Sequence, residues 1–109
     1  MGRMMGTFMQ THDIYLCPVL GTPPPKLGIL DMMTEDVGTY LANLGKIMPY
    51  PGLFNMTGQP SMSVPLHWTP DGLPVGVMFT GRFGDDATLI RLAAQLEEAK
   101  PWIDHKPSM

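Results

Sequence analysis

Nucleophilic hydrolysis needs a hydroxyl or thiol beside a base, together with hydrogen-bond donors that face the developing oxyanion. The serines of this chain are Ser61, Ser63 and Ser108. None of them lies in a Gly-x-Ser-x-Gly turn, which exposes the nucleophile in many hydrolases. Ser61 and Ser63 instead alternate with apolar residues, as is typical of a half-buried strand. We therefore predict that no serine of this chain is a nucleophile.

The cysteine and the histidines form no catalytic or metal-binding pattern. Cys17 lies in an apolar run, where burial would raise the pKa of its thiol and make it inert. His12, His67 and His105 are far apart in the sequence, and no two of them have the spacing of metal ligands on one element. We predict no catalytic residue, no metal site and no cofactor.

Three segments are predicted to be the strands that position these side chains. Residues 14–20 are a continuous apolar run, which suits a buried strand. Residues 61–68 alternate between apolar and polar side chains, and residues 75–80 return as a hairpin partner after the turn Thr69-Pro70-Asp71-Gly72. Because Pro65 cannot donate to a ladder, we expect an edge or a bulge there.

Three segments have helical spacing. Residues 1–11 place several methionines on one side, and residues 37–47 follow a predicted N-cap at Thr34 and end before Pro49. The last helix is capped by Asp85 or Asp86 and ends at Pro101, and Trp102 is expected to fold back onto the domain. Its apolar stripe is predicted to consist of Leu89, Leu92, Ala93 and Leu96, widened by Ile90, Ala94 and Ala99.

Composition limits the classes of function. The chain of 109 residues is expected to form one domain, residues 1–109, with a formal charge of −3 and no Lys/Arg cluster, which argues against nucleic-acid binding. No stretch reaches the ~20 apolar residues that a membrane span needs. The single cysteine excludes an internal disulfide, so a reducing cytoplasm is the expected location.

Several motifs, taken together and in this order, resemble the C-terminal end of the amidase-signature hydrolases. They are FMQTHDIYLCPVLGTPPPKLG near the start, PGLFNMTGQPSMSVPL, DGLPVGVMFTGRFGDDATLIRLAAQLE and the late PW. The chain departs from the family pattern at two places: Val19 stands where a threonine is expected, and Cys17 replaces a more usual threonine. The resemblance covers nearly the whole chain, and the ordered spacing makes it specific.

The resemblance implies an α/β (α+β) fold. The family folds as one α/β domain around a large mixed sheet, and this segment resembles its final quarter. The expected structure is therefore a partial mixed β-sheet with a β-hairpin and two to three packing helices. The loop 55–60 is expected to approach the substrate pocket, with Asn55, Thr57, Gly58 and Gln59 as the pocket-adjacent residues.

The resemblance also implies what chemistry this chain lacks. The family cuts amide bonds with a Ser–Ser–Lys triad that lies in its N-terminal half, and no position here matches the triad. We therefore expect a C-terminal fragment of an amide hydrolase that is inactive alone. Two alternatives remain open: a piece that completes a split amidase carrying the triad on an N-terminal chain, and a small partner-binding module derived from an amidase.

Truncation has a physical consequence for association. Strands that would pair with upstream strands end in open edges, and apolar faces meant for other helices stay uncovered. We therefore predict a homo-oligomer, most simply a homodimer, formed by edge-to-edge pairing or by exchange of elements. The residues do not identify the substrate amide.

Overall fold

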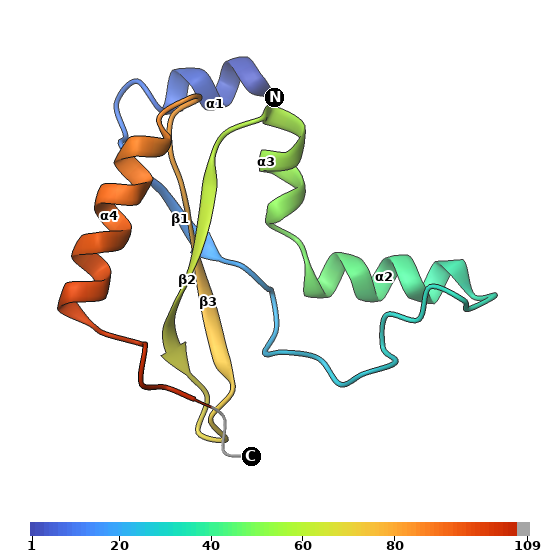
Figure 1. Ribbon diagram of the computed structural model, residues 1–109. Helices are drawn as coiled ribbons and strands as arrows, with labels where there is room; N and C mark the ends of the chain where they lie inside the picture. Colours follow the sequence, from blue (N-terminus) through green and yellow to red (C-terminus); the bar gives the residue numbers. More distant parts are fainter. Residues whose placement is uncertain (107–109) are drawn as a thin grey trace.

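A computed structural model describes residues 1–106 of the chain. Within these residues the chain forms four helices and three strands (Figure 1). The helices are α1 (Gly2–Phe8), α2 (Val37–Ile47), α3 (Pro51–Thr57) and α4 (Asp86–Ala99). The strands are β1 (Tyr15–Pro18), β2 (Ser61–Trp68) and β3 (Pro74–Thr80). The predicted α/β class is confirmed.

The three strands form one sheet in the order β1-β3-β2, and both pairings are antiparallel. The predicted β2–β3 hairpin is confirmed, and Gly72 at its turn has φ +81°, which glycine adopts without strain. A bulge between Pro65 and His67 interrupts the β2 register, as expected from the proline. The prediction was a partial mixed sheet, whereas within residues 1–106 the sheet is antiparallel throughout.

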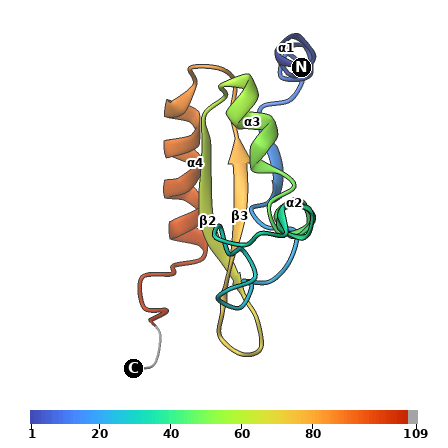
Figure 2. The same cartoon turned by 90° about the vertical axis from the view of Figure 1, so that its right-hand side faces the viewer.

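Helices cover both faces of the sheet (Figure 2). Strand alternation sends odd and even positions to opposite faces, so one core forms on each side. On the α4 side of the sheet, the core consists of Val64, Phe79 and Leu89. On the α1 and α3 side, the core consists of Cys17, Phe54 and Met78. The predicted burial of Cys17 is confirmed.

The arm, defined here as residues 22–48, extends away from the sheet and carries α2 (Figure 1). Asp36 caps α2, because its side chain accepts a hydrogen bond from the Thr39 N–H at 3.0 Å. The predicted cap, Thr34, is wrong; its hydroxyl instead accepts from the Asp36 N–H at 3.2 Å. Ile47 is buried, but Leu41 remains 58% exposed. The arm therefore presents apolar side chains to solvent.

Helix α4 begins and packs largely as expected. Asp85 is its N-cap, and Trp102 packs against the core that contains Leu89. Ile90, Ala94 and Ala99 were expected to widen the buried stripe, but all three are exposed, Ile90 to 70%. Consecutive residues of a helix are rotated by about 100° around its axis, so the buried face that contains Leu89 does not extend to its neighbour Ile90.

The chain is flat and extended for its length. Its extents are 43 × 38 × 18 Å, and its radius of gyration is 16.2 Å. A compact domain of this length has a radius of gyration of about 13 Å. The difference reflects the protruding arm and the thin sheet, and it leaves much apolar surface uncovered.

A candidate substrate-pocket wall

A shallow depression of about 640 Å³ lies where α1, the end of α3 and the segment after β3 meet. Its polar lining comes from Gln10, Thr57, Gln59 and Arg82, and its apolar lining includes Met9 and Phe83. These side chains come from segments far apart in the sequence. The sheet brings them together, because the β2 and β3 ends that carry Gln59 and Arg82 lie side by side.

The predicted pocket-adjacent residues were expected in a loop, but part of that segment is helical. Asn55 and Thr57 lie in α3, which begins at Pro51. Pro51 takes the first position of this helix, where a proline is favourable because no helical N–H is lost. Thr57 and Gln59 line the depression, whereas Asn55 is exposed on α3 outside it.

Gly58 makes the turn that brings Thr57 and Gln59 to the same depression. It ends α3 with φ +74°, and its N–H donates to the Phe54 carbonyl at 2.8 Å. A Cβ at this position would also lie 3.3 Å from the Phe83 ring. The left-handed backbone conformation therefore favours glycine here, and the exposed Phe83 ring would have to shift slightly to accept a Cβ.

Gln59 is held in place although it is polar and only 9% exposed. The Thr57 hydroxyl is hydrogen-bonded to the Gln59 side-chain oxygen, and it also lies 3.1 Å from the Leu53 carbonyl oxygen. A buried side-chain amide is stable only when its polar atoms find partners. The Thr57–Gln59 pair is consequently a fixed hydrogen-bonding group in the wall of the depression.

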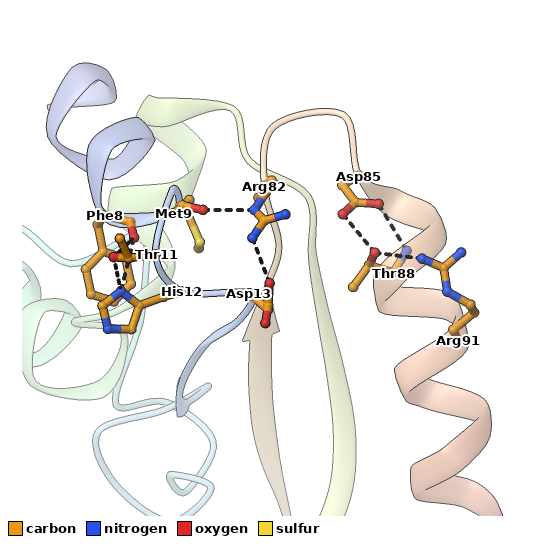
Figure 3. Close-up of polar contacts among 9 residues, drawn as sticks. All are labelled: Phe8, Met9, Thr11, His12, Asp13, Arg82, Asp85, Thr88 and Arg91. Carbon is orange, nitrogen blue, oxygen red and sulfur yellow. Dashed lines mark hydrogen bonds and ion pairs between the residues drawn. The ribbon is translucent and has the colours of Figure 1, made fainter.

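Arg82 joins the N-terminal segment to the end of β3 (Figure 3). Its Nε donates to the Met9 carbonyl at 2.8 Å, and its Nη2 lies 2.7 Å from Asp13 Oδ1. Sequence reasoning missed this tie, because Asp13 and Arg82 are 69 positions apart and no local pattern links them. The tie fixes α1 against the depression.

The histidine beside this tie has a local structural role. The His12 ring stacks on Phe8 with centroids 4.1 Å apart, and its Nδ1 lies 3.1 Å from the Phe8 carbonyl oxygen (Figure 3). Its second polar neighbour is the Thr11 hydroxyl at 3.0 Å. These contacts use the ring to close the turn after α1.

The serines in the described part of the chain take part in sheet packing. The Ser61 hydroxyl is 2.7 Å from the Thr80 hydroxyl, and a Cβ at Gly76 would lie 2.8 Å from the Ser63 hydroxyl. Ser108 lies outside the described residues. Lys100 donates from its ammonium to the Leu66 carbonyl rather than to a serine.

The remaining candidate groups have structural surroundings. Burial raises the pKa of the Cys17 thiol, which suits an inert core residue. Among residues 1–106, no group of three or more His, Cys, Asp or Glu side chains is placed to hold a metal ion. None of the helices in that range combines the length and hydropathy that crossing a bilayer needs.

Asp85 has a capping role (Figure 3). Its carboxylate accepts from the Thr88 hydroxyl at 2.8 Å and from the Thr88 N–H at 3.3 Å, and Arg91 donates to the same hydroxyl at 2.8 Å. The hydrogen bond with the Thr88 side chain is the largest cause that lowers the pKa of Asp85. The carboxylate thus stays ionised at the start of α4, where the helix dipole favours it.

Comparison with known proteins gives a consistent assignment. The family described as Amidase matches residues 1–90. The chain is 39% identical over 100 residues to the amidase homologue AmiC of Mycobacterium leprae (strain TN), covering 92% of this chain and 21% of that protein. It is 30% identical over 102 residues to the 6-aminohexanoate-cyclic-dimer hydrolase of Pseudomonas sp. (strain NK87), covering 89% and 21%.

Solved structures agree with the sequence matches. A structure of 6-aminohexanoate cyclic dimer hydrolase aligns with a TM-score of 0.78 at 28% identity, covering 98% of this chain and 23% of that one. The structure of the same enzyme complexed with substrate aligns with a TM-score of 0.79. The chain thus spans about a fifth of the length of the relatives that it matches. With a family match over most of its length and the corresponding fold, the chain belongs to the amidase family.

Proposed function

We propose that this chain is the C-terminal part of an amide hydrolase and forms one wall of its substrate pocket. The nucleophile and its lysine would come from the N-terminal part of the amidase fold, as the resemblance implies. The observation that carries the proposal is the fixed Thr57–Gln59 pair in the wall of the depression beside Arg82. The role is therefore to bind and position substrate rather than to attack it.

The wall has the chemistry that an amide substrate would require. An amide group presents one acceptor oxygen and a donor nitrogen, and the wall offers a side-chain amide, a hydroxyl and a guanidinium. Met9 and Phe83 add apolar surface next to these groups. Sites for small molecules combine apolar surface with a few fixed polar groups in this way.

The proposal predicts that the chain alone does not hydrolyse amides. Ser61 and Ser63 lie in a paired strand and have no lysine as a hydrogen-bond partner in the described structure. A serine hydroxyl without an adjacent base is a weak nucleophile. We therefore expect no release of ammonia or amine from simple aliphatic and aromatic amides by the purified chain.

Reconstitution tests the positive half of the proposal. The N-terminal part of the AmiC homologue, expressed as a separate chain, is mixed with this chain, and hydrolysis of the same amides is followed. We expect activity in the mixture and none in either component. The variant Gln59→Ala should raise KM in the mixture, whereas the matched change Gln95→Ala, on the exposed side of α4, should not. Equal activity without this chain would refute the proposal.

Reconstitution also separates the two alternatives. A complementing piece of a split amidase restores hydrolysis when its N-terminal partner is added. A partner-binding module binds a protein through exposed apolar residues, such as Leu27 and Met33 on the arm, without restoring hydrolysis. The Thr57–Gln59 pair favours the first alternative, because a module that binds only through the arm has no use for a fixed polar wall.

We also propose that the chain works in the cytoplasm. The support is its one cysteine, which is buried and free in the fold. Secreted domains of this size commonly rely on disulfides. Fractionation of cells that express the chain with a C-terminal tag should find it in the cytosolic fraction, and recovery from the medium would contradict the proposal.

A further inference from the structure

The Thr57–Gln59 pair decides which end of the Gln59 side-chain amide faces the depression. The Thr57 hydroxyl has one proton and two acceptors within reach, the Leu53 carbonyl oxygen at 3.1 Å and the Gln59 side-chain oxygen at 2.5 Å. The shorter distance lies within the range of O–H···O hydrogen bonds and below the range of N–H···O hydrogen bonds. The oxygen of the Gln59 amide, rather than its nitrogen, therefore faces Thr57.

The amide nitrogen of Gln59 is consequently left for another partner. Within residues 1–106, the side-chain hydrogen bond of Gln59 is made by its oxygen. No fully buried side-chain nitrogen or oxygen in that range lacks a partner, so this nitrogen must reach the surface. The surface that Gln59 lines is the depression. Gln59 therefore presents hydrogen-bond donors to it.

Arg82 lies beside Gln59 in the same wall. The antiparallel register of β2 and β3 continues beyond the ends of both strands, because the Gly81 N–H donates to the Pro60 carbonyl at 3.0 Å. The next step along this register sets Gln59 opposite Arg82. Both side chains line the depression, so their donors converge on one part of it.

Arg82 has donors beyond those that tie it to the N-terminal segment. A guanidinium carries five N–H groups, and the hydrogen bonds to the Met9 carbonyl and to Asp13 use two of them (Figure 3). The Arg82–Asp13 pair is 46% and 84% exposed, so water screens it and the charge of Arg82 is only partly offset. No Asp or Glu among residues 1–106 lines the depression. This wall is therefore rich in donors and positively charged.

We propose that the substrate is an amide that also carries a carboxylate, and that this carboxylate accepts hydrogen bonds from Gln59 Nε2 and from Arg82. The inference rests on the function proposed above. An ionised carboxylate is an acceptor only, which matches donors on both sides, and hydrogen bonds to it are stronger than neutral ones. Met9 and Phe83 offer apolar surface for the carbon chain between the two groups. Thr57 is a positioning residue, because it fixes the orientation of the Gln59 amide.

The mixture of this chain with the N-terminal part of the AmiC homologue tests the proposal. The substrates are succinamate, glutaramate and adipamate, each compared with its diamide, in which a carboxamide replaces the carboxylate. We expect kcat/KM to be about tenfold or more higher for at least one monoamide than for its diamide. A mixture that hydrolyses amides without this preference would overturn the carboxylate assignment alone. A mixture inactive on every amide would overturn the proposed function as well.

A near-isosteric variant shows whether Gln59 itself recognises the carboxylate. Gln59→Glu keeps an oxygen against Thr57 but replaces the donor with a negatively charged acceptor. KM for the preferred monoamide should therefore rise about tenfold or more, and KM for its diamide should change less. The matched control Gln95→Glu adds the same charge on the exposed side of α4 and should change neither KM. An unchanged KM for the monoamide in Gln59→Glu would show that no donor of Gln59 meets the carboxylate.

Variants of Thr57 test its positioning role. Thr57→Val removes the hydroxyl at nearly constant volume and frees the Gln59 amide to turn over. The preference for the monoamide over its diamide should fall about fivefold, through KM rather than kcat. Thr57→Ser retains a hydroxyl and should retain the preference. Loss of the preference in both variants, or in neither, would show that the hydroxyl does not orient Gln59.

Discussion

Replacing Gly21 by alanine should loosen the arm from the sheet. A Cβ at Gly21 would lie 2.4 Å from the Lys46 carbonyl oxygen and 3.0 Å from Pro49 Cγ. The carbonyl belongs to the last turn of α2, so it cannot rotate away as a flexible side chain could. The Gly21 N–H also donates to the Ile47 carbonyl at 2.9 Å, which ties the two segments together at the same point.

The size of the effect follows from this contact. Restoring ordinary contact from 2.4 Å requires a shift of about 1 Å, which would break the Gly21–Ile47 hydrogen bond and disturb the burial of Ile47. Overpacking of this kind costs about 1–3 kcal/mol, and a lost hydrogen bond about 1 kcal/mol. We therefore expect Gly21→Ala to lower the free energy of unfolding by about 2–4 kcal/mol, and Tm by roughly 10–20 °C.

The assay is thermal unfolding followed by circular dichroism, with Gly45→Ala as the control. Gly45 lies within α2 and has open space where a Cβ would be added. Alanine there should stabilise the helix by about 0.5–1 kcal/mol, because glycine is the poorer helix former. The two variants should therefore shift Tm in opposite directions. If Gly21→Ala unfolds at or above the Tm of the unmodified chain, the docking of the arm is described wrongly.

Three further predictions concern the core, the caps and the thiol. Leu89→Ala should cost about 2–5 kcal/mol in denaturant unfolding, whereas Ile90→Ala, its exposed neighbour, should cost far less when measured on dilute monomer; equal costs would contradict the packing of α4. The fold lowers the pKa values of Asp36 and Asp85 from 3.8. Their ionised forms therefore stabilise the protein above that value, and this stabilisation is lost as the pH falls through the lower folded pKa. Tm should drop over this acid range, and it should drop less in the variant Asp85→Asn. Cys17 should react with a thiol reagent only as fast as the chain opens, and fast labelling of native protein would show that the thiol is accessible.

Sequence patterns predicted the elements whose periodicity reflects burial. The alternation of residues 61–68 matched β2, and the helical stripe containing Leu89 matched α4. The turn at Gly72 and the bulge after Pro65 were also predicted, because proline and glycine impose local geometry that does not depend on the rest of the fold.

Features that depend on distant contacts were missed. Helix α3 has only 7 residues, follows Pro49 and begins at Pro51, so its sequence suggests a helix end rather than a new helix. A helix this short is stable only through tertiary contacts, and here Phe54 is buried against the sheet. The Arg82 tie to Asp13 and Met9 joins two segments that are far apart in the sequence, and no local pattern predicts it. The predicted pocket-adjacent residues remain a prediction: Thr57 and Gln59 line the depression, Gly58 makes the turn between them, and Asn55 lies outside it.

We propose that this chain forms part of an amidase pocket, while the nucleophile belongs to another part of the fold. The most direct test uses a probe that phosphonylates nucleophilic serines. The probe is added to the chain alone and to the chain mixed with the N-terminal part of the AmiC homologue, and the modified serine is located by mass spectrometry. We expect an adduct on a serine of the N-terminal part and none on this chain. An adduct on Ser61, Ser63 or Ser108, formed by the pure chain, would contradict it.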